Sequence, residues 1–486
     1  MAKSIKVNAL LNFSKQVVST IFPLITVPYA TRILGAKDYG AVNYTNSIIS
    51  YFVLLAGLGI STYATREGAR IRKDKQKLAQ FASEVFSINV VSCALAYVLL
   101  FILLLCWKGE RAYIALLVIQ SFAIAANTFG MDWINTVFED YAYLTIRYIC
   151  FQVLSLLALL IFVHSPNDSA IYAFCTILPT FGGNICNLWY VRRYVKVRLT
   201  RHLHLKQHIR AILTLFANNL ASVIYLSSDQ TLLGILKDSR AVGLYSLPVK
   251  IYTVIQGAFN AMTYVMVPRL SALIAGNDDR AIQRLLDNTF RVLLTVVIPA
   301  SIGLAFLSQD IIVVLSGEEY ASGTIVLRIM SVTLLFSVFN CFFANGILIP
   351  FRLEGDFLVA TSIAALMNLG LNFLFIPLWG INGAAFTTLL SELYILCHVG
   401  YSSRKIYVPS FSSKFVFSIL LGSLAVAGVC WVVETFVSQS LLRIILAVFG
   451  SMVAYALIEI ITGNDMAKEL ISSTFKRLST IVHKHE

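Results

Sequence analysis

Four basic residues lie within or at the ends of long apolar stretches: Lys15, Arg32, Lys250 and Arg328. A charge at the centre of a bilayer costs about 2.5–3.5 kcal/mol on insertion scales, so such residues normally face a watery cavity or a partner. We therefore predict that Lys15 faces a cavity, and snorkelling to lipid head groups is the alternative for Lys15 and Arg328. For Arg32 the alternative is a cap on a helix C-terminus, and for Lys250 it is an ion pair with Asp229.

Three carboxylates lie in comparable surroundings: Asp132, Asp229 and Glu392. Acidic residues inside membrane proteins commonly belong to ion or proton pathways, because their charge is otherwise too costly to keep there. We predict that these carboxylates couple an ion or line a cavity. For Asp229 the alternatives are a structural hydrogen bond to a neighbouring helix or an ion pair with Lys250.

Polar side chains at helical spacing accompany two of these charges. Positions 218, 222, 225 and 229 are separated by 4, 3 and 4 residues, which places them on one helical face. The residues one turn to either side of Lys15 are polar as well. The predicted polar lining is Asn12, Gln16, Asn218, Ser222 and Tyr225.

Three prolines interrupt the apolar stretches that carry these residues: Pro23, Pro28 and Pro248. Proline removes a backbone hydrogen bond and can bend a helix. We predict that they act as gate or hinge positions, with an inert kink as the alternative.

The elements that hold these side chains are predicted to be membrane helices. Hydrophobic residues make up 58% of the 486 residues and charged residues only 13%, against roughly 25% in soluble domains. About 20 apolar residues span a bilayer as a helix. We therefore predict an all-α polytopic membrane protein with about fourteen spans. The predicted spans are 9–33, 41–65, 80–106, 112–138, 141–163, 170–191, 211–236, 242–268, 286–312, 323–350, 357–377, 379–401, 415–436 and 441–462.

The basic residues gather in short connectors, mainly at 66–77 and 192–210. Because Lys and Arg in short loops mark the cytoplasmic side, both termini are predicted to be cytoplasmic, in a bacterial inner membrane. The net charge of +13 reflects this bias. Basic residues scattered over short loops argue against nucleic-acid binding.

Enzymatic patterns are missing from the sequence. It has no GxSxG, HExxH, P-loop or DxD motif, and its eight cysteines form no CxxC pair. We therefore expect no enzyme, no metal site and no cofactor, with H⁺ or Na⁺ as the candidate coupling ion. Short external loops argue against a membrane polymerase or transferase, and an assembly scaffold would leave the intramembrane charges unexplained.

A weak internal repeat with an offset of about 200 residues suggests two halves. Leu34-Gly35, Asp38, Gly40 and Tyr44 are echoed by Leu233-Gly234, Asp238, Gly243 and Tyr245. Parallel repeats would place a substrate path at their interface. We predict an N-terminal lobe of six spans (1–200), a second lobe of six spans (201–403), and two further spans with a cytoplasmic tail (404–486).

Several motifs resemble those of Wzx-type polysaccharide flippases of the MOP superfamily. The stretch 28–40, PYATRILGAKDYG, is similar to the family signature, and VGLY (242–245), VPRLS (267–271) and GINGAA (380–385) continue the match. The family pattern after the fourth span, a Trp followed by Gln-Gly-x-Glu, is only partly kept. Trp133 and Glu139 remain, but Val137 and Phe138 replace the Gln-Gly pair.

The resemblance implies a MATE/MurJ-like fold with two six-helix lobes around a cavity. In that cavity the expected substrate-binding, cationic lining for the diphosphate of the substrate is Lys15, Arg32, Lys250 and Arg328. It also implies transport of undecaprenyl-diphosphate-linked oligosaccharide repeat units to the periplasmic leaflet, for O-antigen, capsule or exopolysaccharide. Expected partners are this lipid-linked glycan, membrane lipids, and the polysaccharide polymerase and chain-length machinery. A MurJ-type lipid II flippase and a MATE-type drug/cation antiporter remain alternatives.

Overall fold

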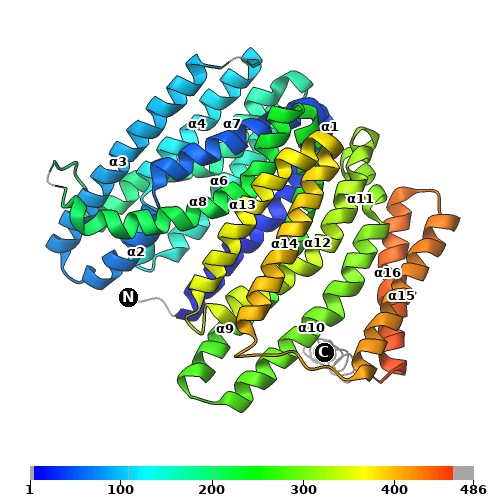
Figure 1. The fold of residues 1–486 in the computed structure, drawn as a ribbon. Helices are drawn as coiled ribbons and strands as arrows, with labels where there is room; N and C mark the ends of the chain where they lie inside the picture. The colour runs from blue at the N-terminus through cyan, green and yellow to red at the C-terminus, as the bar shows by residue number, and fades with distance from the viewer. Residues whose placement is uncertain (1–4, 108, 202, 464–486) are drawn as a thin grey trace, which may run out of the picture. The chain divides into compact units, whose positions relative to one another are not determined.

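The computed structural model describes residues 5–107, 109–201 and 203–463, and the described chain is overwhelmingly α-helical (Figure 1). Thirteen of its helical stretches are long and apolar enough to span a membrane. The helices are α1 (Ile5–Gly57), α2 (Ile60–Ile71), α3 (Lys75–Leu105), α4 (Arg111–Gly130), α5 (Asp132–Val137), α6 (Tyr141–Phe162), α7 (Ser169–Tyr190), α8 (Leu205–Leu236), α9 (Ser239–Ala275), α10 (Asp279–Phe306), α11 (Ser308–Ser316), α12 (Thr324–Phe343), α13 (Glu354–Trp379), α14 (Ile381–Ser403), α15 (Ser413–Phe436) and α16 (Ser440–Ile461).

The fourteen predicted spans all fall on these helices, which confirms the all-α polytopic fold. The first two predicted spans share α1, which is interrupted at Gly35. Gly35 has φ 70° and ψ 176°, a backbone conformation outside the helical region that glycine adopts without steric cost. The long α1 is therefore two helices joined at a kink, and the chain is a multi-pass membrane protein.

Packing divides the chain into two compact units. Unit 1 comprises Met1–Ser246 and Ala365–Ile381, and unit 2 comprises Leu247–Ala364 and Asn382–Glu486. The lobe boundaries predicted at residues 200 and 403 concern a pseudo-symmetry and stay a prediction. Each unit is described separately below.

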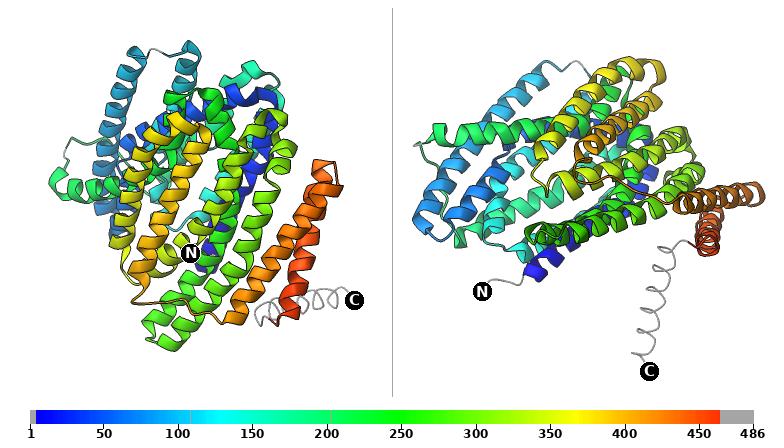
Figure 2. Two further views of the ribbon diagram at one scale, coloured as in Figure 1. Left: turned by 45° about the vertical axis from the view of Figure 1, so that its right-hand side comes forward. Right: turned by 60° about the horizontal axis from the view of Figure 1, so that its bottom comes forward.

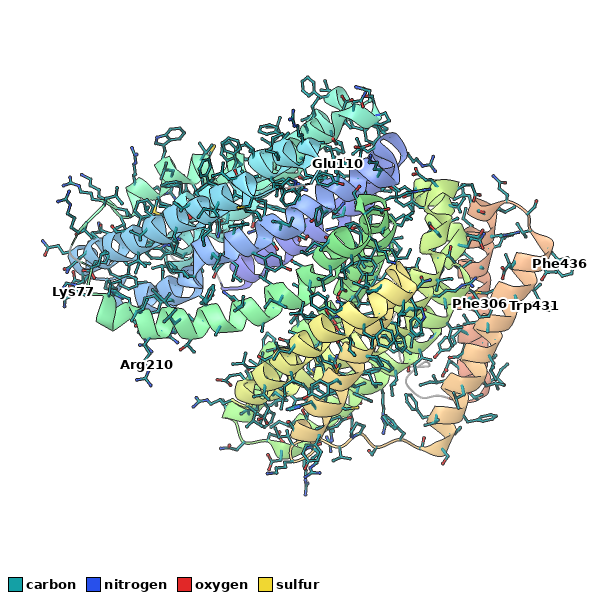
Figure 3. The ribbon with its side chains drawn as sticks, turned by 45° about the horizontal axis from the view of Figure 1, so that its top comes forward. Lys77, Glu110, Arg210, Phe306, Trp431 and Phe436 are labelled. Carbon is teal, nitrogen blue, oxygen red and sulfur yellow. The ribbon has the colours of Figure 1, made fainter. Side chains whose placement is uncertain are left out.

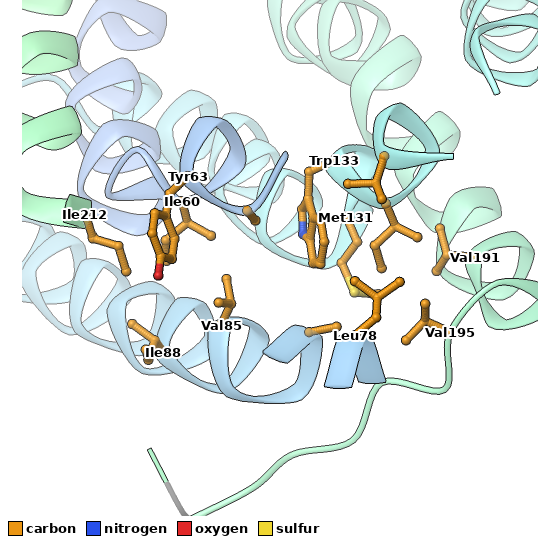
Figure 4. Close-up of a cluster of buried hydrophobic side chains, with 14 residues drawn as sticks. Ile60, Tyr63, Leu78, Val85, Ile88, Met131, Trp133, Val191, Val195 and Ile212 are labelled. Carbon is orange, nitrogen blue, oxygen red and sulfur yellow. The ribbon is translucent and has the colours of Figure 1, made fainter. Parts of the chain in front are cut away.

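A buried apolar cluster fixes one end of unit 1. It joins α2, α3, α5, the connector after α7 and the start of α8 (Figure 4). Leu78 and Ile212 are almost fully buried, and Trp133 packs edge-on against Phe81 with ring centroids 6.2 Å apart. The short helices α2 and α5 are held in place by this cluster.

The two most basic connectors lie together at this end of unit 1. The backbone N–H groups of Arg198 and Thr200 donate to the hydroxyls of Ser83 and Ser87 on α3, over 3.1 and 2.9 Å. Figure 3 places Lys77 and Arg210 at this end and Glu110 at the opposite end of α3. The sequence assigned both connectors to one side of the membrane, and their packing agrees with that assignment.

In unit 2, α10 packs against α12 and α15, and α15 packs against α16. The left view of Figure 2 shows α15 and α16 side by side. The outer face of α15 is apolar, with Trp431 62% and Phe436 81% exposed. Such a face is suited to lipid contact, as the apolar composition predicted.

Candidate functional site

The four predicted cations occupy different surroundings. Lys15 on α1 is half-buried, and its ammonium lies 5.4 Å from the ring centroid of Tyr148 in a cation–π contact. Arg32, Lys250 and Arg328 are exposed. Two of the four belong to unit 1 and two to unit 2, so their grouping in one cationic cavity stays a prediction.

Asp229 is the most deeply held of the predicted unit 1 carboxylates, and its side chain is buried. Tyr245 donates its hydroxyl to one carboxylate oxygen over 2.5 Å, and Asn372 donates its amide to the other over 2.6 Å. Asn372 also donates to Asn368, which accepts from Ser228. This network joins α8 to α9 and α13, so Asp229 makes the hydrogen bonds to neighbouring helices that a structural role requires. A role of Asp229 in ion coupling stays a prediction.

The polar lining around these charges is only partly described. Ser222 is exposed and Tyr225 half-buried on the face of α8 that leads to Asp229. The side chains of three predicted lining residues lie outside the described part of the structure: Asn12, Gln16 and Asn218.

Asp132 lies at a break between α4 and α5, where Met131 takes a left-handed conformation (φ 49°). One terminal nitrogen of Arg147 donates to both carboxylate oxygens of Asp132, over 2.8 and 2.9 Å. Asn187 on α7 donates to the freed backbone carbonyl of Gly130 and to Asp132, over 2.5 and 3.0 Å. The Arg147 side chain is only 8% exposed, whereas that of Asp132 is 39% exposed, so the guanidinium is buried while its carboxylate partner reaches water.

Glu392 on α14 is buried within unit 2. The amide of Asn340 on α12 donates to its backbone carbonyl over 3.0 Å and to its carboxylate. This contact joins two helices, and a coupling role for Glu392 stays a prediction.

The three predicted hinge prolines lie inside helices, Pro23 and Pro28 in α1 and Pro248 in α9. The helical geometry of α1 is lost at Gly35 rather than at either proline. Close to Pro28, the Tyr29 hydroxyl donates to the carbonyl of Val163 over 2.9 Å and fixes α1 to the end of α6. Hinge motion stays a prediction.

Asp140, just before α6, anchors an aromatic group next to the second basic connector. It accepts from the hydroxyls of Tyr190 and Tyr194 over 2.6 and 2.8 Å, and from Arg193 over 2.8 Å. Burial raises the pKa of Asp140, but these hydrogen bonds and the charge of Arg193 outweigh it, so the pKa falls below its ordinary value. Asp140 therefore stays ionised and holds the end of α7.

A buried carboxylate–histidine group in unit 1 escaped the sequence analysis. Glu84 on α3 and His208 on α8 are each almost fully buried, and their carboxylate oxygen and Nε2 lie 3.0 Å apart. His208 Nδ1 lies 2.7 Å from the hydroxyl of Tyr63. His204 and Gln80 hold the other carboxylate oxygen, at 3.1 and 2.9 Å. The i, i+4 spacing of His204 and His208 was the available signal in the sequence.

His208→Ala should lower the free energy of unfolding by about 2–3 kcal/mol, because it leaves the buried Glu84 and Tyr63 with an unmet hydrogen bond. Thermal unfolding of the purified protein measures this as a drop in Tm. His164→Ala is the matched control, since His164 is exposed. An equal Tm for the two variants would contradict the assigned role of the group.

The two copies of the sequence repeat meet within unit 1. A Cβ atom added to Gly40 would overlap the carbonyl oxygen of Ser239 and lie 2.6 Å from the amide nitrogen of Gly243. One added to Gly243 would overlap the carbonyl of Ala36. The backbones of α1 and of the start of α9 therefore touch at their glycines.

Each unit contains a sizeable cavity. The cavity of unit 2 has a volume of about 540 Å³ between α10, α11, α15 and α16, and its wall is mostly aliphatic. The few polar groups in its wall include the buried Glu459, which accepts from Ser418 over 2.7 Å. The cavity of unit 1, of about 390 Å³, is lined by α1, α2, α4 and α8.

Comparison with known sequences decides the family. The model of the family described as polysaccharide biosynthesis protein matches residues 5–274, more than half of the chain. The chain belongs to the polysaccharide biosynthesis protein family. This membership confirms the resemblance found in the sequence motifs, including PYATRILGAKDYG, which lies inside the matched region.

Curated relatives of this polysaccharide biosynthesis protein carry transport or capsule names. It is 25% identical to the "Putative O-antigen transporter" of Escherichia coli K12, over 77% of this chain and 91% of that protein. It is 22% identical to the capsular polysaccharide biosynthesis protein CapF of Staphylococcus aureus, over 81% of this chain and 98% of that protein. These relatives support a transport protein rather than an enzyme.

Solved structures confirm the predicted MATE/MurJ-like fold of this family member. The lipid II flippase MurJ, in an inward closed conformation, matches with a TM-score of 0.74 and 15% identity, covering 96% of this chain and 99% of that one. An inward-facing multidrug MATE family transporter of the MOP superfamily matches with a TM-score of 0.60 and 13% identity, over 82% of this chain and 98% of that one. At these identities the likeness concerns the fold alone.

Proposed function

We propose that this chain is a flippase for undecaprenyl-diphosphate-linked oligosaccharide repeat units in a bacterial inner membrane, with both termini cytoplasmic. The observation that carries the proposal is the apolar cavity of unit 2, among helices whose outer faces are also apolar. A polyprenyl tail gains about 0.8 kcal/mol per buried CH₂ group, so such a cavity suits a lipid-linked substrate better than a hydrophilic drug. The names of the curated relatives favour a surface glycan as the cargo.

The substrate also needs its charged head group stabilised in the membrane, and the cationic residues meet this need. A diphosphate carries about two negative charges, and Lys15 or Lys250 would stabilise it during passage. Outward movement of two negative charges is favoured by about 4.6 kcal/mol per 100 mV of inside-negative potential. Alternating access of the two repeats, coupled to H⁺ or Na⁺ through a carboxylate such as Asp229, completes the proposed cycle.

A lipid II flippase is the second candidate, because MurJ shares the fold over almost the whole chain. Its substrate has the same kind of diphosphate-linked tail and differs in the head group. Polysaccharide polymerase and chain-length proteins are the proposed partners of the first candidate only.

Complementation tests the proposal. Expression of the chain should restore surface polysaccharide to a strain that lacks its repeat-unit flippase, and Lys15→Ala with Lys250→Ala should reduce that polysaccharide by at least about tenfold. The control is Lys405→Ala, an exposed lysine in the connector before α15. Normal polysaccharide with the double variant, at equal protein level, would remove the two lysines from the site. Rescue of a lipid II flippase mutant instead would favour the second candidate.

A further inference from the structure

The cavity of unit 1 has a lining unlike that of unit 2. Uncharged hydrogen-bonding side chains reach it from four helices: Asn46 and Ser50 from α1, Ser61 and Thr62 from α2, Asn127 from α4 and Asn219 from α8. Among the described residues that line it, none carries a charge. A volume of about 390 Å³ lies in the range of small-molecule sites, about 300–1,000 Å³.

Three of its amides are available to a ligand. Asn46, Asn127 and Asn219 are exposed, and within the described chain their side chains make no hydrogen bond to another residue. Each amide offers two donors and one acceptor, which matches the paired donor and acceptor character of a hydroxyl group. Such side chains at this depth of a membrane protein need water or a polar ligand.

The backbone at this cavity is broken as well. Between α1 and α2, Leu58 and Gly59 take left-handed conformations, with φ 45° and 71°. The carbonyl of Ala56 freed by this break accepts from Asn89 and Ser92, over 2.5 and 2.6 Å. Irregular backbone at membrane depth is tolerated where it is buried in protein or lines a cavity, and interrupted helices commonly form transporter binding sites.

We propose that the cavity of unit 1 binds a neutral sugar of the lipid-linked substrate through the amides of Asn127 and Asn219 and the hydroxyl of Thr62. This inference rests on the proposed function and adds which part of the substrate is held here. A charged lining would suit the diphosphate, whereas uncharged amides and hydroxyls suit sugar hydroxyls. Because a site built to hydrogen-bond hydroxyl groups binds an analogue without them less tightly, the site also selects against a head group that lacks those hydroxyls.

A binding experiment with two lipids tests the proposal. The full chain is placed in nanodiscs and titrated with undecaprenyl-diphosphate-linked oligosaccharide, extracted from the organism that encodes the chain, or with undecaprenyl diphosphate that lacks sugar. Asn127→Ala/Asn219→Ala should weaken binding of the glycan-bearing lipid by at least about tenfold and leave binding of the bare lipid unchanged. The matched control is Asn167→Ala, an exposed asparagine in the connector before α7.

Each outcome decides the question. Equal losses for both lipids, or no loss for either, would overturn the sugar site while the proposed function stands. Binding of neither lipid by the unaltered chain would overturn the proposed function and the sugar site with it. If the double variant fails to fold, Thr62→Val removes one exposed hydroxyl at nearly constant volume and should still weaken binding of the glycan-bearing lipid selectively.

Discussion

Gly243→Ala should destabilise the protein by at least about 3 kcal/mol, and Gly40→Ala by a similar amount. Each added methyl group would overlap a backbone carbonyl, that of Ala36 or that of Ser239. Backbone cannot rotate away as a side chain can, so α1 and α9 would have to separate. The measurement is the Tm and the yield of monodisperse protein after purification.

Gly370→Ala on α13 is the matched control, because a Cβ atom there meets nothing within 4 Å. Alanine is a better helix former than glycine by about 1 kcal/mol, so this control should keep or raise the Tm. If Gly243→Ala had the same Tm as the control, the result would contradict the close backbone contact between the two repeat motifs.

Asp132→Ala should lower the free energy of unfolding by about 2–3 kcal/mol, because it leaves the buried Arg147 guanidinium without its carboxylate; the 39% exposure of the Asp132 side chain limits the loss. Beyond Asp132, the Arg147 guanidinium has a long hydrogen bond of 3.4 Å to Asn184 and a cation–π contact with Tyr143. Thermal unfolding measures the loss. Removing both charges in Asp132→Ala/Arg147→Met should recover part of it, since a neutral pair has no buried charge to compensate.

Glu110→Ala provides the control for loss of an acidic residue. Glu110 pairs with Lys37 at 3.9 Å, with both side chains more than half exposed, and exposed pairs contribute about 0–1 kcal/mol. A Tm for Asp132→Ala within the range of this control, or no recovery in the double variant, would contradict the account of the α4–α5 break.

The helical framework followed from the sequence because runs of about 20 apolar residues are a strong and local signal. Bends in the first span were predicted at Pro23 and Pro28, whereas the helical geometry of α1 is lost at Gly35, which the sequence analysis had used only as part of the repeat and family motifs. The repeat motifs were found by their spacing. Their contact with each other, across about 200 residues, required the structure.

The side-chain networks were less predictable, because their partners are distant in the chain. Asp229 could be singled out as an intramembrane charge, but its partner Asn372 lies 143 residues away on α13. Glu84 and His208, 124 residues apart, form a pair that no local pattern specifies. Asn127 and Asn219 could not be predicted as binding residues, because only the structure shows that both line the same cavity.

The most direct test of the central claim is a leaflet assay in proteoliposomes. Lipid-linked oligosaccharide extracted from the encoding organism is incorporated on both sides, and a membrane-impermeant glycosidase reports how much sugar becomes accessible from outside. The account predicts that the chain makes the inner pool accessible within minutes, whereas vesicles without protein keep about half of the glycan protected. Continued protection of half the glycan in the presence of folded, unaltered protein would contradict the flippase assignment.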